Sequence, residues 1–578
     1  MAHEHAIKWL DWTDQTFQRA RSENKPILLD ISAVWCHWCH RLDQDTYSVP
    51  EIVEYIESHF IPIRVDTDKR PDINRRYNMG GWPTTAFLTP NGLVMGGGTY
   101  FPPDQMRQIL LDVYSIWEKT KDKPSSPLMP EPENIPVGDI SISIVDEVLG
   151  DIANNFDPIY GGFGSQPKFP STDAHELALL KYHYTGNREI LNIGTLTLQN
   201  VGKSRLFDSE MGGFFRYSTV RDWSIPHFEK MSEDNAKWLS LYLHAYQETG
   251  EQFYATIAKR TLEYVMTWLS DQENGCFYGS QDADEEYYNL TKNERLKVTA
   301  PYIDKQIYTN WNALMITAFF EASVILGEVS LRNFAMKSLH RLMSLNYNGT
   351  HMAHYDNEPQ LPTQLADQMQ TARMLSHAYE LTGDRKFIQT AEDIVRSAVD
   401  KLNDNEHGGF FDTIIDPSAP GYLSRPAKPL DENSTASRVL VKLHYLTGKE
   451  HYRKLAEETL RQFVEVFPQF GLMAADYALA VDTFLSEPTI IRIIGPLENP
   501  QTLRLLTESN RIYDPRKIIQ VCDPDKDAKH IAELGYPSSD LPTVFVCLGK
   551  LCGAPITEPP NIVSELTRLR AGQFTRRF

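Results

Sequence analysis

The stretch "DISAVWCHWCHR", residues 30–41, holds two cysteines three residues apart and two histidines. Three kinds of functional site contain such a pattern: a redox dithiol, a c-type haem attached covalently through C-x-x-C-H, and half of a zinc site. A purely structural cysteine pair is a fourth possibility. The elements around Cys36 and Cys39 must distinguish among these four kinds of site.

A redox dithiol is favoured by what precedes the two cysteines. The apolar run "PILLDIS" predicts a buried strand that leads through a short turn into a helix beginning near Cys36. Unpaired N–H groups and the helix dipole stabilise a thiolate at a helix N-terminus, which lowers the pKa of the thiol. A partly cationic His37 would stabilise the thiolate further. We therefore predict that Cys36 attacks a disulfide and that Cys39 resolves the mixed disulfide.

A haem site and a zinc site fit this stretch less well. Haem attachment needs an exported protein and a ligand-bearing cavity, and the sequence indicates neither. A zinc site needs four ligands; His40 could be a third, but no second C-x-x-C follows at the spacing of a zinc finger. The position of His40 behind the cysteines is therefore expected to be incidental, and we predict no metal and no cofactor.

A second indication lies in "GGWPTTAFLTPNG", residues 80–92. A proline that opens a strand and is followed by a hairpin suits a cis-proline loop beside a dithiol. We predict that Pro83 offers backbone to an incoming peptide or disulfide, and that Trp35 and Trp82 shape the docking site. The strand, the W-C-x-x-C helix, the strand ending in "RVDTD" and this proline together resemble a thioredoxin fold.

Strands and helices alternate over about the first 120 residues, as is typical of an α/β domain. The following "KDKPSSPLMPEPENIPVGD" is rich in Pro, Ser and charge, which indicates a linker. We predict a thioredoxin-like domain over residues 1–120 and a linker over residues 121–139.

Two elements recur beyond the linker. One is a helix that ends at a small residue, as in "LYLHAYQETGE" and "VKLHYLTGK"; the other is a glycine-aromatic loop, as in "YGGFG" and "HGGFFD", which recurs at intervals of 51 to 74 residues. Helical hairpins that cannot bury their apolar faces alone must stack. The intervals exceed the roughly 33–47 residues of open solenoids. We therefore predict an all-α (α/α)6 toroid over residues 140–486, with an irregular helical domain as the alternative.

The last segment, residues 487–578, contains the strand-like runs "TIIRIIG", "RKIIQVC" and "PTVFVCLG", and it is predicted to be a small α/β region. Cys547 and Cys552 form a C-x4-C pair there. A second redox or metal site is one interpretation of this pair, but a cysteine buried in a strand favours packing, and we expect no chemistry from it.

Polar residues gather in the loops of the predicted toroid. If the toroid closes, these loops meet over its mouth, where Trp223 and Phe228 would supply aromatic platforms. The pocket is predicted to contain Lys168, Arg221, Asp222, His227, Glu229, Lys230, Asn235, Asp282 and Asp284. Further candidates are Asp234, His351, His354, Arg425, Lys428 and Asp431.

This pocket has two chemical interpretations. Paired carboxylates could serve as acid and base on a glycoside, and His227 with a carboxylate could exchange a proton at a sugar carbon. The alternative is a network of structural ion pairs that ties the loops together, because ion-pair networks are common in proteins. Both interpretations stay open for each charge.

The composition excludes several classes of protein. A formal net charge of −20 disfavours binding to nucleic acid or to an anionic membrane surface, and no basic stripe is present. Six cysteines among 578 residues are too few for a disulfide-built scaffold. The sequence shows no apolar run of about 18 residues and no signal-peptide pattern, so we expect a cytoplasmic protein without membrane partners.

Several longer motifs resemble one family. "WCHWCH", "GGWPT", "RDWSIPHFEKM", "GCFYGSQDADEE", "NWNALMI" and "KPLDENSTASRVL" are similar to the thioredoxin-domain family that includes spermatogenesis-associated protein 20 and its bacterial relatives. This resemblance implies a thioredoxin-like domain fused to a toroid like those of N-acylglucosamine 2-epimerases and six-hairpin glycosidases. It also adds Trp311 and Asn312 to the predicted pocket.

The chain departs from the family pattern at two places. The segment between Asp284 and Trp311 is shorter than usual, and Ser232-Glu233 replaces the usual Leu-Tyr. Both differences affect the predicted mouth of the toroid.

Two functions follow from the sequence. The first is a thiol–disulfide oxidoreductase whose partners are a protein disulfide or a thiol reductant and whose toroid binds a substrate or partner. The second is a carbohydrate-active enzyme, an epimerase or glycosidase, that acts on a small carbohydrate through His227, Glu229, Asp282 and Asp284. A toroid that serves only as a scaffold is the third possibility.

Overall fold

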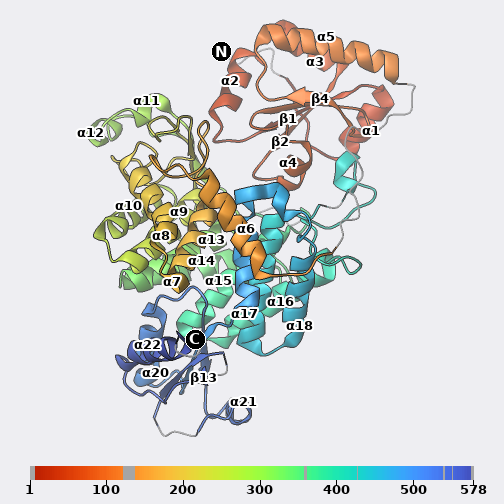
Figure 1. Cartoon of the computed structure of the whole chain (residues 1–578). Helices are drawn as coiled ribbons and strands as arrows, with labels where there is room; N and C mark the ends of the chain where they lie inside the picture. The colour runs from red at the N-terminus through yellow and green to blue at the C-terminus, as the bar shows by residue number, and fades with distance from the viewer. Residues whose placement is uncertain are drawn as a thin grey trace. The chain divides into compact units, whose positions relative to one another are not determined.

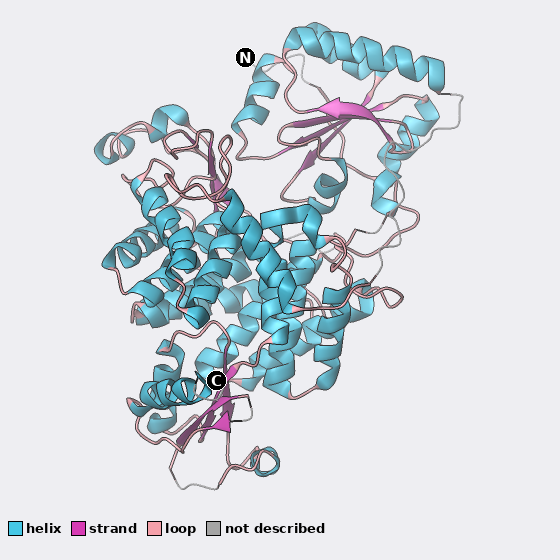
Figure 2. Cartoon of the chain, viewed as in Figure 1, coloured by secondary structure: helices cyan, strands magenta, loops and turns pink. Residues whose placement is uncertain are grey.

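A computed structural model describes residues 7–121, 137–356, 361–425, 427–537, 541–549 and 551–574. Most of the predicted linker, residues 122–136, lies outside the described residues. The chain forms two compact units. The first comprises Met1–Asn134, Ser280–Asp304 and Phe411–Ala427, and the second comprises Ile135–Gly279, Lys305–Phe410 and Lys428–Phe578. Figure 1 shows the course of the chain and Figure 2 its helices and strands.

The first unit contains the predicted thioredoxin-like sheet, with strand order β2-β1-β3-β4. Strand β1 pairs in parallel with β2 and antiparallel with β3, and β3 pairs antiparallel with β4. The strands are β1 (Ile27–Ser32), β2 (Ile61–Asp66), β3 (Thr84–Leu88) and β4 (Val94–Gly98). The helices are α1 (Asp14–Glu23), α2 (His37–Asp45), α3 (Pro50–His59), α4 (Pro71–Tyr77) and α5 (Pro103–Thr120).

Helices cover both faces of this sheet, because side chains of alternating β1 residues point to opposite faces. Ile27, Leu29 and Ile31 pack with α1 and α4, while Leu28 packs with α2, α3 and α5. The strand that leads to the dithiol is therefore buried on both faces, which makes it a rigid support for the turn that follows.

Two segments from far along the chain complete this unit. The first contains β8 (Ser280–Gln281), α11 (Glu285–Tyr288), α12 (Lys292–Arg295) and β9 (Ile303–Asp304), and the second contains the 3-10 helix η1 (Gly421–Ser424). Tyr77 stacks on Tyr422 and donates a 2.9 Å hydrogen bond to the carbonyl oxygen of Gly92. Gly421 has a φ of +61°, and a Cβ there would overlap the Gly92 carbonyl, so only glycine fits this approach.

The inner helices of the second unit form a closed ring, which confirms the predicted toroid. Each inner helix packs against the next, and the last packs against the first. In the described part of the chain the inner helices are α7 (Thr172–Thr185), α9 (Ser232–Thr249), α13 (Thr309–Ile325), α15 (Leu365–Thr382), α17 (Leu430–Thr447) and α19 (Ala475–Leu485). The outer ones are α6 (Ile142–Asn155), α8 (Arg188–Lys203), α10 (Gln252–Trp268), α14 (Val329–Asn346), α16 (Arg385–Leu402) and α18 (Glu450–Arg461). Among the residues described, we find no helix long and apolar enough to cross a membrane.

Four inner helices end at the recurring small residue, which in each case is a glycine with a left-handed backbone conformation. Gly186, Gly250, Gly383 and Gly448 each cap a helix with φ between +68° and +73°, and each donates its N–H to a carbonyl of the last turn. The glycine therefore turns the chain from an inner helix into the next outer one.

The glycine-aromatic loops return the chain from outer to inner helices. Most form a small antiparallel bridge between residues on either side of the turn, such as Phe207 with Phe214 and Asn403 with Phe410. The loop near residue 471 differs, because Phe467–Ala474 is a 3-10 helix (η2) instead. The sixth hairpin therefore closes the ring through a different turn.

The C-terminal residues form a second sheet, with strand order β11-β10-β12-β13. Its pairings are parallel for β10 with β11 and antiparallel for β10 with β12 and β12 with β13, as in the N-terminal sheet. The elements are β10 (Thr489–Ile494), α20 (Pro500–Arg511), β11 (Lys517–Cys522), α21 (Ala528–Glu533), β12 (Thr543–Leu548), β13 (Leu551–Cys552) and α22 (Asn561–Phe574). The predicted small α/β region therefore repeats the thioredoxin-like topology, which the sequence analysis did not foresee.

Candidate functional site

The two cysteines lie where the sequence predicted, at the N-terminus of α2. Cys36 is the N-cap residue, with extended backbone, and its Sγ accepts a 3.2 Å hydrogen bond from the N–H of Cys39. The two sulfurs form a disulfide, and both residues are buried. When the pair is reduced, the free N–H groups of the first turn point towards Cys36 and favour its thiolate.

Two of the predicted docking residues, Trp35 and Trp82, contact each other, and Trp35 directly precedes Cys36. The peptide bond between Trp82 and Pro83 is cis, as the sequence predicted. The rings of Trp35 and Trp82 meet edge to face with centroids 5.7 Å apart, and Trp35 Nε1 donates a 2.6 Å hydrogen bond to Asp68. These contacts hold the two indoles in fixed positions; the docking of a substrate against them stays a prediction.

His40 is not incidental to this site. Its Nε2 lies 3.1 Å from the Val34 carbonyl oxygen and 3.1 Å from Asp282 Oδ2. Both partners only accept hydrogen bonds, so Nε2 carries a proton. The hydrogen bond to Asp282 raises the pKa of His40, against the opposing effect of burial. The structure therefore places a favoured cation one turn after Cys36, whereas the predicted role of His37, which packs against Trp38, stays a prediction.

Asp30 is a buried titratable residue that the sequence analysis missed. It lies in the middle of β1, where burial raises the pKa of its carboxyl group to about 6 in spite of a 2.6 Å ion pair with Arg64. Its Oδ1 has no hydrogen-bond partner among the described residues. The signal was present in "PILLDIS", where one acid interrupts an apolar strand.

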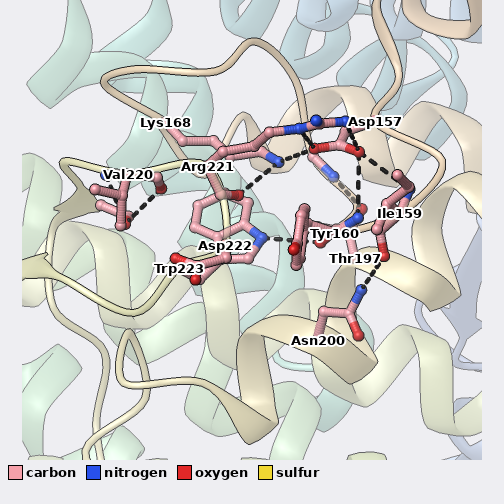
Figure 3. Close-up of polar contacts among 12 residues, drawn as sticks. Asp157, Ile159, Tyr160, Lys168, Thr197, Asn200, Val220, Arg221, Asp222 and Trp223 are labelled. Carbon is pink, nitrogen blue, oxygen red and sulfur yellow. Dashed lines mark hydrogen bonds and ion pairs between the residues drawn. The ribbon is translucent and has the colours of Figure 1, made fainter.

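Lys168 and Arg221 of the predicted pocket bind a single carboxylate, that of Asp157 (Figure 3). Lys168 Nζ lies 2.8 Å from Asp157 Oδ2, and Arg221 binds both carboxylate oxygens at 2.8 and 2.9 Å. These hydrogen bonds hold the pKa of Asp157 below its usual range even though burial opposes this. The buried Trp223 lies over Lys168 Nζ and donates a hydrogen bond to the Tyr160 carbonyl oxygen. The cluster fastens two loops together.

Lys230 has the same kind of partner in the next loop. It is buried, its Nζ lies 2.7 Å from Asp208 Oδ2, and it also donates to the Gly212 carbonyl oxygen at 2.8 Å. Lys428 repeats the arrangement with Asp404 at 2.7 Å. The lysines at corresponding places therefore neutralise the aspartate that opens a glycine-aromatic turn.

Asn235 and Asn312 clamp the aromatic residues of these loops. Asn235 Oδ1 accepts from the Phe214 N–H at 2.7 Å while its Nδ2 donates to the Phe214 carbonyl, and Asn312 holds Phe277 in the same way. Both amides are buried. For these four predicted pocket residues, Lys168, Lys230, Asn235 and Asn312, the contacts match a structural network rather than an open pocket.

His227 and Glu229 are brought together. His227 Nδ1 lies 2.9 Å from Glu229 Oε1, and the imidazole stacks on Tyr217 with centroids 4.7 Å apart. Tyr217 lies in the short strand β5 (Tyr217–Ser218) and His227 in β6 (Pro226–His227), while Glu229 directly precedes β7 (Lys230–Met231). Asp222 lies apart from this pair and caps its own loop by accepting hydrogen bonds from Ser224.

The remaining candidates are divided between the two units. Asp282 and Asp284 belong to the unit of the dithiol, where Asp284 caps α11 by accepting from the Tyr287 N–H at 2.8 Å. Trp311 lies in α13 and hydrogen-bonds Glu233. His354 pairs with Asp367 at 2.8 Å, while His351 contacts Lys401, so these two histidines do not form one site.

The inner helices of the ring carry a polar cluster that was not among the predicted pocket residues. Every inner helix contributes a charged side chain: Glu176, His244, Glu321, Arg373, Arg438 and Asp476, in ring order from α7. Ion pairs join neighbouring helices within this set: His244 lies 2.9 Å from Glu176 and 3.8 Å from Glu321, and Arg438 lies 2.8 Å from Asp476. The expectation that loops rather than helices carry the polar residues was therefore wrong.

His244 of this cluster and His377, which also lies on an inner helix, α15, have opposite protonation preferences. Burial disfavours the cation of His244, but Glu176, whose Oε2 lies 2.9 Å away, and Glu321 together raise its pKa to about 9. Burial, followed by the nearby Lys442 and Arg373, lowers the pKa of His377 well below its usual range. At neutral pH His244 is a cation and His377 is neutral, so the ring holds an acid and a base.

The dithiol and the sheet that supports it define a thioredoxin-like protein, here joined to a helical toroid. The family Thioredox_DsbH, described as "Protein of unknown function, DUF255", matches residues 1–127. Over 96% of its length the chain is 25% identical to spermatogenesis-associated protein 20 of Homo sapiens, covering 89% of that protein. The resemblance found in the motifs is confirmed, and the chain is similar to spermatogenesis-associated protein 20 over nearly its whole length.

Two further similarities concern single regions. Thioredoxin of Alicyclobacillus acidocaldarius is 28% identical over 18% of this chain and 93% of its own length. The cellobiose 2-epimerase of Spirochaeta thermophila is a similar solved structure, with 16% identity, a TM-score of 0.48, and coverage of 60% of this chain and 97% of its own.

Proposed function

We propose that the chain is a thiol–disulfide oxidoreductase that uses Cys36 and Cys39. The observation that supports this function best is the position of the pair: a disulfide between the N-cap residue and the first turn of α2, carried on a thioredoxin-like sheet. A protein disulfide as substrate and a thiol as reductant are part of this proposal.

In the proposed reaction the Cys36 thiolate attacks one sulfur of a substrate disulfide, and the other substrate sulfur leaves as a thiolate. Cys39 then loses its proton and attacks Cys36, which releases the reduced substrate and leaves Cys36 and Cys39 oxidised. The helix N-terminus favours the Cys36 thiolate, and Asp282, which raises the pKa of His40, favours a positive charge on this helix. Asp30, with a pKa of about 6, supplies a buried acceptor for the Cys39 proton.

The pH dependence of Cys36 reactivity tests this function. In the reduced full-length Cys39→Ser chain, the rate of Cys36 alkylation by iodoacetamide should rise with a midpoint of about 7, because the helix N-terminus stabilises the thiolate. Mass spectrometry of the peptide that contains Cys36 gives the rate at each pH. A midpoint close to 8.5, the value of an ordinary thiol, would contradict the proposal.

The variant Asp282→Asn in the same background separates the contribution of His40. Without the carboxylate, the pKa of His40 falls towards its ordinary value, so His40 loses its proton at a lower pH. The helix then carries this cation less often, and the Cys36 midpoint should rise by about half a pH unit. The matched control Asp284→Asn, which changes a carboxylate that does not contact His40, should leave the midpoint unchanged.

A second function is supported by the cluster inside the ring. We propose that it binds a small polar substrate of the carbohydrate class and moves a proton with His377 as base and His244 as acid. The observation that favours it is the opposite protonation preference of these two histidines in one ring.

Proton exchange with solvent tests this second function. Incubating the chain with a panel of free sugars in heavy water should place deuterium on a carbon of one of them, as detected by NMR. His377→Gln should slow this exchange by about 100-fold or more. An intact chain that exchanges no sugar proton would refute the function, and Gln199→Glu, outside the cluster, serves as the matched control.

A further inference from the structure

We propose that Cys547 and Cys552 form a second redox centre, in which a thiol reductant opens the disulfide by attacking Cys552 while Cys547 leaves. The two residues are direct partners in the antiparallel pairing of β12 with β13, and the structure joins them by a disulfide. This finding replaces the expectation that Cys547 serves packing alone. The proposal does not depend on the function of Cys36 and Cys39.

This centre is not a copy of the first. The C-terminal sheet has the same topology as the N-terminal one, so α20 stands where a thioredoxin-like dithiol would begin. The N-cap of α20 is Asn499, followed by Pro500, and no cysteine is present there. The sulfur atoms lie instead on the hairpin formed by β12 and β13.

The two sulfurs differ in access to solvent. Cys552 is exposed, whereas Cys547 is only 3% exposed and lies within β12. A reductant from solvent therefore reaches Cys552, and Cys547 becomes the leaving group. The difference in burial between Cys547 and Cys552, rather than their order in the C-x4-C motif, determines which sulfur is attacked.

Tyr536 and Arg492 are placed to stabilise the leaving thiolate. The Tyr536 hydroxyl oxygen lies 3.4 Å from Cys547 Sγ and 3.9 Å from Cys552 Sγ. Arg492 donates to this same oxygen, and a guanidinium cannot accept a hydrogen bond, so the hydroxyl proton of Tyr536 is available to sulfur.

Arg492 also gives this face of the sheet a positive charge. It lies in β10, is 8% exposed, and donates its Nε hydrogen to Gln520. None of the ion pairs found among the described residues involves Arg492. A buried cation without a carboxylate partner favours an anion nearby, and a reduced Cys547 supplies one.

A thiolate of a dithiol reductant bonds to Cys552 Sγ, the Cys547–Cys552 bond breaks, and Cys547 leaves as a thiolate that accepts the Tyr536 hydrogen bond. The second thiol of the reductant then displaces Cys552 and closes its own disulfide. The pair gains two electrons and, after protonation, two protons, while the reductant loses the same.

The test uses the folded full-length chain with Cys36→Ser and Cys39→Ser, so that the first dithiol cannot contribute. Dithiothreitol at pH 7 should reduce the Cys547–Cys552 pair while circular dichroism stays native, and removal of the reductant in air should restore it. Alkylation followed by mass spectrometry counts the two thiols. Reduction that occurs only in denaturant would overturn the proposal, because the pair would then be a structural staple.

Four single substitutions in this background, one of them a control, test the assigned roles. Tyr536→Phe should slow reduction about tenfold, because a hydrogen bond to a developing charge is lost, whereas Tyr477→Phe, a buried tyrosine of the ring, should leave the rate unchanged. With oxidised glutathione, Cys547→Ser should form a mixed disulfide at Cys552 at least about tenfold faster than Cys552→Ser forms one at Cys547. Equal rates in either comparison would overturn the roles of Tyr536 or Cys552.

Discussion

Replacing Cys36 by serine is expected to lower the rate of disulfide exchange by on the order of 1,000-fold or more, because the hydroxyl cannot supply a thiolate at neutral pH. Cys39→Ser should allow the first attack and then stop, since no second thiol can release Cys36. The measurement is the reduction of a disulfide-bonded peptide, with the mixed disulfide of the Cys39→Ser chain identified by mass spectrometry.

The Cys552→Ser background removes any contribution from the C-terminal pair. Cys522→Ser is the matched control, because burial raises the pKa of the Cys522 thiol to about 11 and leaves it almost without thiolate at neutral pH. If Cys36→Ser retained the exchange rate of this background, the dithiol would not be the reacting group.

Asp412→Ala is expected to destabilise the dithiol unit locally by about 3 kcal/mol. Arg76 binds both oxygens of Asp412, at 2.7 and 3.0 Å, and the two side chains are 7% and 2% exposed. Removal of the carboxylate leaves a buried guanidinium whose other partners are carbonyl oxygens. An uncompensated buried charge of this kind is more costly than the loss of an exposed ion pair.

Hydrogen–deuterium exchange measures this loss segment by segment. Protection of Pro71–Tyr77 and of the segment that carries η1 should fall by about 100-fold in Asp412→Ala. Asp416→Ala is the matched control, because Asp416 is exposed in the same segment and binds only Ser418 and local backbone. Equal protection in the two variants would show that the Arg76–Asp412 pair does not hold the segment.

What the sequence predicted correctly rests on local patterns. The strand, the helix N-terminus at Cys36 and the cis bond before Pro83 all lie within short runs whose residue types determine the local backbone. The toroid was predictable for a similar reason, since the repeated glycine after each helix indicates one hairpin after another.

What the sequence could not provide are contacts between distant segments. His40 and Asp282 are separated by 242 positions, and Arg76 and Asp412 by 336. No repeat or motif predicts a contact between residues at such separations. The sequence therefore indicated no role for His40 at the dithiol and no role for Asp412. Asn235 and Lys230 are polar residues in a conspicuous motif, yet burial and partners, which only the fold reveals, determine what they do.

The polar cluster of the inner helices could be predicted from the sequence only in part. Glu176 and His244 interrupt helices that are otherwise apolar on their buried sides, and such interruptions are visible in "HELALLKYH" and "LYLHAYQ". Which of these residues would meet across the ring still required the order and closure of the inner helices.

The division of the dithiol unit among three segments determines when it can be completed on the ribosome. The sheet is synthesised by Asn134, but the last segment of the unit ends at Ala427, about 300 residues later. At roughly 5–20 residues per second, this interval lasts roughly 15–60 s. Until those segments are made, the nascent sheet has neither Asp282 beside His40 nor Asp412 beside Arg76. The dithiol is therefore present in the cell before the contacts that complete its unit can form.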